Sequence, residues 1–213
     1  MTDLLTAPYA PAEAEDYRGP FVVLEGISGV GKSTLTRLLG ERLDAATLHT
    51  LPEPHSSVST AVNDQLKALP QFAFYLSGLL HASDVIRDAL TRGPVVADRY
   101  VSSVLACHAA VHSAGLDQVS ALLAPFRPYL ITPDITFYLS TSNTELSKRI
   151  QSKTDLKQDD TDLFDVPGRL SALRKNFTAV ALVDPSAVHL DTDNRSPAAL
   201  TEAIIKHLEE IRA

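Results

Sequence analysis

Short apolar runs along the chain alternate with longer segments in which apolar residues recur every three or four positions. The apolar runs predict strands over residues 21–25, 47–51, 94–98, 133–139 and 187–191. The longer segments predict helices over residues 32–43, 71–90, 102–114, 116–124, 142–153, 170–183 and 197–211. Because strands that alternate with helices form parallel βαβ units, the pattern predicts an α/β fold with helices on both faces of the sheet.

Two polar segments interrupt this pattern. Residues 1–19 are rich in Ala, Pro, Asp and Glu, which predicts a flexible N-terminal tail. They have neither a basic start nor a long apolar core, so we do not expect a secretory signal. Residues 156–168 are polar and acidic and predict a mobile loop. Residues 20–213 contain no linker and predict a single domain.

Composition and charge narrow the class of protein. Of the 213 residues (23.0 kDa), 45% are hydrophobic and 21% are charged, which is typical of a globular domain. The net charge of −7 argues against binding to duplex nucleic acid, which needs a basic face. No apolar run reaches the length of a membrane span. Cys107 is the single cysteine, which excludes a disulfide within the monomer and favours a reducing, cytoplasmic location.

The strongest motif follows the first predicted strand. Residues 26–33, GISGVGKS, match G-x-x-x-x-G-K-[ST] between a strand and a helix, the setting that a phosphate-binding loop requires. Lys32 supplies a cation that reaches β- and γ-phosphates, and the hydroxyl of Ser33 is placed to bind Mg²⁺. Backbone N–H groups are expected to surround phosphate oxygens at this helix N-terminus. We expect the donor to contact Gly26, Ser28, Gly29, Val30, Gly31 and Thr34.

Kinases, GTPases and ATPase motors all use such a loop. GTPases also need a D-x-x-G switch followed by an N/T-K-x-D motif. Residues 165–168 (DVPG) and 152–155 (SKTD) look similar, but they occur in the reversed order and follow no predicted strand. Motor ATPases usually need a longer chain. A GTP-dependent switch and a nucleotide-binding partner protein without turnover remain as alternatives to a kinase.

Further segments make the chain resemble the thymidylate kinase and deoxynucleoside kinase superfamily. Residues 51–54 (LPEP) follow the second predicted strand and are similar to the family's Glu-Pro element. Residues 98–103 (DRYVSS) follow the third strand and are similar to its Asp/Glu-Arg element. The opening at residues 24–35 is similar as well, as is the fourth strand with the helix after it. The resemblance spans the chain from about residue 21 to the closing helix.

The resemblance implies a P-loop NTPase fold with a five-stranded parallel sheet of order 2-3-1-4-5. It implies a kinase that moves the γ-phosphoryl group of ATP, with Mg²⁺, to a nucleoside 5′-hydroxyl or a nucleoside monophosphate. A lid over the donor phosphates corresponds to residues 149–168. Relatives commonly pair through helices that flank the acceptor site, so the resemblance also implies a homodimer.

The family suggests catalytic roles that the chemistry supports. Glu53 orients or deprotonates the acceptor, and Asp98 holds Mg²⁺ together with Ser33. Arg99 contacts the acceptor and, with Arg149 of the lid, neutralises the charge that develops on the transferred group. These residues follow parallel strands or belong to the lid, so we expect them at the edge of the sheet where ligands bind.

Other similarities concern the two bases. Lys153, one helical turn after Arg149, adds a lid cation. Arg195 follows the fifth strand and would stack on the adenine of the donor. Gln71 corresponds to a base-reading glutamine of the deoxynucleoside kinases. Phe74 and Tyr75 lie on the same predicted helix, where their rings either stack on an acceptor base or pack in the core.

The acceptor side departs from the family. Pro52 and Gly78 stand where relatives carry arginines, and Ser28 stands where thymidylate kinases carry Asp in the phosphate loop. The loss of two arginines removes cations that would hold an acceptor phosphate. This favours an uncharged acceptor, such as a nucleoside. If the acceptor is a monophosphate, Lys67 and Arg87 are the first alternatives as its ligands.

Overall fold

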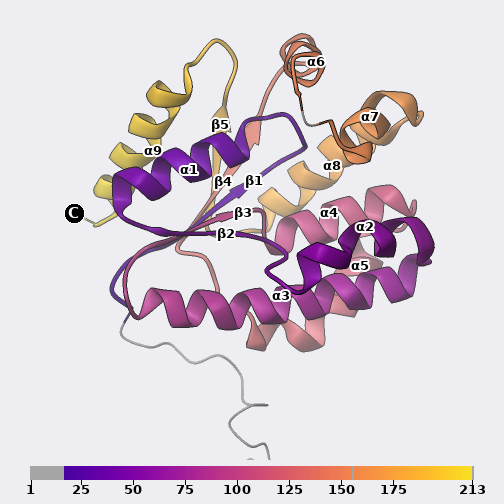
Figure 1. Ribbon diagram of the computed structural model, residues 1–213, viewed down its shortest axis with the longest axis horizontal. Coiled ribbons are helices and arrows are strands. Elements are labelled where there is room, and N and C mark those ends of the chain that lie inside the picture. Colours follow the sequence, from indigo (N-terminus) through magenta and orange to yellow (C-terminus); the bar gives the residue numbers. More distant parts are fainter. Residues whose placement is uncertain (1–16, 155, 213) are drawn as a thin grey trace, which may run out of the picture.

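Parallel strands form the centre of the molecule (Figure 1). The computed structural model describes residues 17–154 and 156–212, and within them a five-stranded sheet has the order β2-β3-β1-β4-β5. The strands are β1 (Phe21–Glu25), β2 (Ala46–His49), β3 (Val95–Asp98), β4 (Ile135–Ser140) and β5 (Ala187–Asp191). All neighbouring pairs are parallel, which confirms the predicted P-loop topology.

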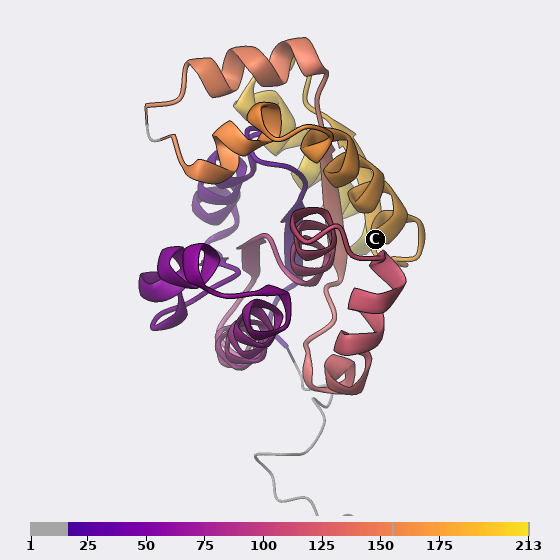
Figure 2. The ribbon, with the colours of Figure 1, turned by 90° about the vertical axis from the view of Figure 1, so that its right-hand side faces the viewer.

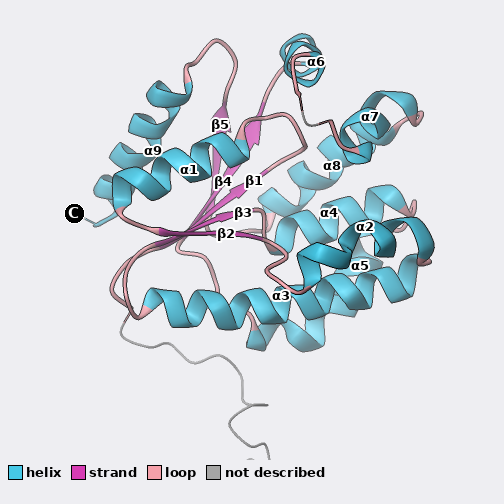
Figure 3. Ribbon diagram, in the orientation of Figure 1, coloured by secondary structure: helices cyan, strands magenta, loops and turns pink. Residues whose placement is uncertain are grey.

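Helices cover both faces of the sheet (Figures 1 and 3). One face packs against α1 (Lys32–Leu43) and α9 (Pro197–Arg212). The other packs against α3 (Ala68–Leu90), α4 (Val101–Val111) and α8 (Arg169–Leu182). The shorter helical segments are α2 (His55–Gln65), α5 (Leu116–Leu123), η2 (Ala124–Tyr129), α6 (Asn143–Gln151) and α7 (Gln158–Asp165). No helix of the described part is long and apolar enough to cross a membrane.

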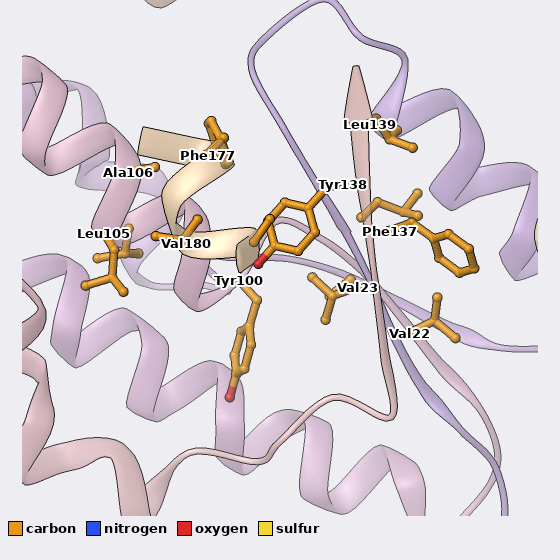
Figure 4. Packing of buried hydrophobic residues seen from close by; sticks show 14 of the residues in the cluster. Val22, Val23, Tyr100, Leu105, Ala106, Phe137, Tyr138, Leu139, Phe177 and Val180 are labelled. Carbon is orange, nitrogen blue, oxygen red and sulfur yellow. The ribbon is translucent and has the colours of Figure 1, made fainter. Parts of the chain in front are cut away.

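The central strands are buried because helices lie on both of their faces. All five residues of β1 are buried. Val22 and Phe137 point to one side of the sheet, and the ring of Phe137 lies 5.8 Å from that of His207 in α9 (Figure 4). Val23 and Tyr138 point to the opposite side, towards α4 and α8. Figure 2 shows the helices around the sheet from a second direction.

The C-terminal ends of β1 and β3 lie next to each other. In the pairing of these strands Leu24 is opposite Asp98, and the N–H of Arg99 donates to the carbonyl oxygen of Leu24 at 2.9 Å. The segments that follow β1 and β3 therefore leave the sheet at the same edge, where open α/β sheets bind their ligands.

Two described α-helices, α2 and α7, were not predicted from the sequence, and neither was the 3-10 helix η2. No residue of α2 is buried, so α2 lacks the apolar stripe from which a helix is recognised. The mobile loop predicted for residues 156–168 is wrong over its centre, which forms α7. Asp160 and Leu163 are buried there and anchor this mostly polar helix. The strand predicted for residues 47–51 also ends earlier, at His49.

The described end of the predicted tail is docked on the domain. The N–H of Arg18 donates to the carbonyl oxygen of Leu90 at 3.0 Å. A Cβ on Gly19 would lie 2.4 Å from the backbone nitrogen of Pro94, so the chain passes very close to the start of β3. Residues 1–16 lie outside the described residues, and the predicted tail and domain boundary stay predictions.

Candidate active site

The phosphate loop joins β1 to α1. Gly26 and Gly31 have φ angles of 137° and 101°, in the left-handed region that favours glycine. A side chain at Gly26 would also lack space, since its Cβ would lie 2.6 Å from the carbonyl oxygen of Leu139 in β4. Gly31 is the N-cap of α1, and Thr34 is exposed in the first helical turn. The first N–H groups of α1 therefore face the loop and can bind phosphate oxygens.

Lys32 turns back into this loop. Its side chain is buried, and Nζ donates to the carbonyl oxygen of Ile27 at 2.6 Å. Burial lowers the pKa of Lys32 to about 7, and repulsion from Arg99 acts in the same direction, while Asp98 and Glu25 oppose the shift. Because a bound anion favours the protonated form, phosphate oxygens beside Nζ would restore its full positive charge.

Ser33 and Asp98 meet at the end of β3. The Ser33 hydroxyl donates to Oδ2 of Asp98, whose Oδ1 is buried without a hydrogen-bond partner among the described residues. A buried carboxylate oxygen without a partner is costly, and Mg²⁺ prefers hydroxyl, carboxylate and phosphate oxygens. The two side chains therefore fit a magnesium site. They also line a groove of about 560 Å³ between α1 and β2, together with His49.

Arg99 lies directly after Asp98. Its φ angle of 72° is in the left-handed region, which is uncommon for a residue other than glycine. Its guanidinium donates to the carbonyl oxygen of Gly26 at 3.2 Å and to the hydroxyl of Ser103 at 3.1 Å. These contacts hold the cation against the phosphate loop, and backbone strain of this kind is frequent at functional sites.

Glu25, the last residue of β1, is a buried carboxylate to which the sequence analysis gave no role. Oε1 accepts the N–H groups of Tyr100 at 2.9 Å and Ser103 at 3.1 Å, and Oε2 accepts the Ser103 hydroxyl. Burial raises the pKa of Glu25, although these hydrogen bonds and Arg99 oppose the rise. Glu25 thus caps the start of α4 and fixes the turn that carries Asp98 and Arg99. An acidic residue inside an otherwise apolar strand is the signal that could have identified it.

The predicted lid, residues 149–168, begins in the last turn of α6. The guanidinium of Arg149 donates to the hydroxyl and carbonyl oxygens of Thr192, both at 2.9 Å, and to the carbonyl oxygen of Val30 at 3.4 Å. It also pairs with Glu145 at 3.0 Å. Arg149 therefore links α6, the phosphate loop and the segment after β5.

Lys153 contacts the phosphate loop through a residue that the sequence analysis missed. Asp160 in α7 accepts the hydroxyl of Ser28 and pairs with Nζ of Lys153 at 2.6 Å. No motif marked Asp160, because it lies in a segment whose polar composition predicted a loop.

The predicted adenine contact lies in the segment between β5 and α9. Arg195 is exposed, and its guanidinium is 3.5 Å from the carbonyl oxygen of Ala199. Asp193 in the same segment accepts the hydroxyl of Thr141 and the N–H of Ser142, the latter at 3.0 Å. The segment is thus fixed to the start of α6, and the role of Arg195 stays a prediction.

Residues predicted to bind the acceptor base meet in a polar cluster. Gln71 is buried, and its amide contacts Nε2 of His112 at 2.5 Å and donates to Oδ1 of Asn63 at 3.0 Å. The Tyr75 hydroxyl donates to the same Asn63 oxygen at 2.9 Å, and the rings of Phe74 and Tyr75 are 5.5 Å apart. The structure thus brings Gln71, Phe74 and Tyr75 together and adds Asn63 and His112, which no motif marked.

Glu53 is exposed at the start of α2. Its carboxylate accepts hydrogen bonds from Ser56 and Ser57, which lower its pKa. The carboxylate therefore caps α2, and its predicted action on the acceptor stays a prediction.

Gly78 of α3, where the resemblance places an arginine in relatives, packs closely against Leu51. A Cβ on Gly78 would lie 2.3 Å from Cδ2 of the buried Leu51, so a larger side chain would displace Leu51. Arg87 pairs with Asp84 at 2.8 Å near the end of α3 that precedes β3, which is the edge of the sheet opposite the phosphate loop. Lys67 is exposed and forms the N-cap of α3.

The two segments that resemble GTPase motifs border helices, and neither follows a strand directly. Asp165 is the last residue of α7, Gly168 is the N-cap of α8, and residues 152–154 follow α6. Their reversed order in the chain and the absence of a preceding strand argue against a GTP switch.

Comparisons with known proteins agree with this geometry. The thymidylate kinase family model matches residues 24–201. A probable thymidylate kinase of Natronomonas pharaonis is 29% identical over 201 residues, which are 89% of this chain and 97% of that protein. One from Methanocaldococcus jannaschii is 27% identical over 90% of this chain and 96% of its own. The solved thymidylate kinase of Candida albicans has the same fold, with a TM-score of 0.75 at 17% identity over 93% of this chain and 94% of that one. The chain therefore belongs to the thymidylate kinase family of P-loop kinases.

Proposed function

We propose that this chain transfers the γ-phosphoryl group of ATP to thymidine monophosphate, with Mg²⁺ held by Ser33 and Asp98. One observation carries the proposal: in a member of this family, a buried Lys32 lies in the phosphate loop beside the Ser33–Asp98 hydrogen bond. The curated relatives from two archaea bear the name probable thymidylate kinase, which supports thymidine monophosphate as the acceptor.

In this proposal the protein positions the two nucleotides and stabilises charge. The loop N–H groups and Lys32 hold the donor phosphates. Ser33 and Asp98 would hold Mg²⁺, and the ion would supply positive charge that offsets the charge of the donor phosphates. Arg99 presents a guanidinium beside Gly26, where it can form two parallel hydrogen bonds to the transferred group. Glu53 accepts a hydrogen bond from the acceptor once the segment before α2 brings it within reach.

Two classes of acceptor compete in this account. The replacements at Pro52 and Gly78 favour an uncharged nucleoside, whereas similarity over most of the chain favours a monophosphate. We adopt the monophosphate because two positions weigh less than the whole-chain match. Arg99 and Lys67 are its proposed cationic ligands. Arg87 is not, because it pairs with Asp84 at the far end of α3.

The test compares kcat/KM for thymidine monophosphate, thymidine and deoxycytidine with ATP at one salt concentration. We expect the monophosphate to exceed both nucleosides by more than about tenfold, or ~1.4 kcal/mol of transition-state stabilisation. Preference for thymidine would instead identify a nucleoside kinase, and no turnover with any acceptor would favour a non-catalytic binding protein. As a control, Lys32→Ala should lose about 100-fold or more in rate while keeping its circular dichroism spectrum.

A further inference from the structure

Asp160 is the buried carboxylate of the lid. Its side chain is fully buried, whereas Gln158, Phe164 and Asp165 of the same helix are exposed. A carboxylate at such a position is rarely tolerated unless several donors surround it. The groups that donate hydrogen bonds to Asp160 therefore explain why α7 packs against the phosphate loop.

Three donors from two segments converge on this carboxylate. Oδ1 accepts the hydroxyl of Ser28 in the phosphate loop. Oδ2 accepts Nζ of Lys153 at 2.6 Å and the N–H of Lys157, the N-cap of α7, at 3.0 Å. Burial alone would raise the pKa of Asp160, but the hydrogen bonds from Lys153, Ser28 and Lys157 outweigh burial and hold the pKa below its ordinary value. The group is therefore an anion at neutral pH.

The phosphate loop thereby gains a carboxylate that its own sequence lacks. Ser28 stands where thymidylate kinases carry Asp, and Asp160 brings a carboxylate to the same point from about 130 residues later in the chain. The ion pair also fixes Lys153, whose side chain is only 26% exposed. An unpaired lysine would keep its flexible stem and ammonium in water.

We propose that Asp160 is a positioning residue for the phosphoryl transfer: it fastens the lid to Ser28 and holds Lys153 beside the phosphate loop. The inference rests on the proposed function, because Lys153 acts there as a donor-phosphate cation. Asp160 itself contacts neither nucleotide. Its effect on the donor is exerted through the lid, which holds Lys153 beside the phosphate loop.

The test exchanges the carboxylate between the two segments. Asp160→Asn should weaken binding of a non-hydrolysable ATP analogue at least about tenfold, because it removes one member of a buried charge pair. Ser28→Asp should also weaken the analogue, since two carboxylates would face each other. The double variant Ser28→Asp/Asp160→Ser should recover most of the lost affinity, because Lys153 again has an anion at the loop.

Asp165→Asn is the matched control, since it removes the same charge from an exposed position on the same helix. Calorimetric binding of the analogue reads the donor site without any acceptor, so a wrong acceptor assignment leaves this result intact. Thermal unfolding checks that each variant is folded, and Lys153→Met tests the same ion pair if Asp160→Asn does not fold. An Asp160→Asn affinity equal to that of Asp165→Asn, or a double variant no better than Ser28→Asp alone, would overturn the proposal.

Discussion

Lys32 combines deep burial with a pKa near neutrality, and this has a measurable consequence. Above pH 7 the side chain of the free protein is increasingly neutral, because its pKa is lowered to about 7. Bound phosphates favour the charged form, so nucleotide binding at pH 8 should take up a proton, up to about one per molecule. We expect affinity for an ATP analogue to fall as the pH rises from 7 to 9.

Calorimetry in buffers of different ionisation enthalpy measures this proton uptake. Lys32→Arg provides the control, because a guanidinium stays charged throughout this pH range. The variant should lose the uptake that originates at position 32. Equal proton uptake by the wild type and Lys32→Arg would show that another group titrates.

Sequence reasoning identified residues that belong to motifs of fixed spacing. It missed residues whose roles depend on the side chains and backbone groups that surround them in the fold. Lys32 and Ser33 belong to a motif in which the chemistry requires each residue at a fixed offset. Asp98 and Arg99 could be found because Asp98 ends a strand and Arg99 follows it directly. Glu25 and Asp160 are single acidic residues, and only the fold reveals that both are buried among donors.

At the level of elements, Glu25 connects β1 to α4. Glu25→Ala would leave the N–H groups of Tyr100 and Ser103 without their acceptor. Each buried unsatisfied donor costs about 1–3 kcal/mol, so we expect the free energy of unfolding to fall by about 2–6 kcal/mol. Urea denaturation measures the change. Glu202→Ala, which removes an exposed ion pair with Arg42, should shift stability by less than about 0.5 kcal/mol. Similar losses in the two variants would refute the capping role.

The lid gives a second prediction at this scale. Among the described side chains of α7, Asp160 and Leu163 are the buried ones, so the helix depends on them for its anchorage. We expect tryptic cleavage after Lys157 to slow markedly when an ATP analogue binds, because the donor phosphates add contacts to the lid. Cleavage after Arg92, in an exposed turn beyond α3, should not change. Equal protection at both sites would indicate general stabilisation instead of lid ordering.

The elements missed by the sequence share a physical reason. α2 exposes most of its residues, and α7 is a short helix whose buried positions, among the side chains described, are Asp160 and Leu163, so neither shows the apolar periodicity that marks a helix. The sheet could be predicted because β1, β3 and β4 are buried on both faces and appear as continuous apolar runs. Its strand order came from the family resemblance.

For the whole molecule we predict a homodimer formed through the helices beside the acceptor site. Three exposed apolar side chains, Val58, Leu66 and Leu69, lie in α2 and around the start of α3. We predict that these side chains form part of the contact between the two copies, because an apolar surface patch is typical of a contact between proteins. Light scattering should give twice the 23.0 kDa of the chain, and Leu69→Glu should shift the mass towards the monomer. A monomer mass at micromolar concentration would contradict the prediction.

The contact between Gly78 and Leu51 also constrains how this enzyme can evolve. An arginine at position 78 collides with Leu51, and its introduction overpacks the site at a cost of about 1–3 kcal/mol. Truncation of Leu51 first leaves a cavity that costs about 2–5 kcal/mol. Either order would pass through a less stable intermediate, so a glycine at position 78 would tend to persist. The phosphate of a charged acceptor would then be bound by cations at other positions.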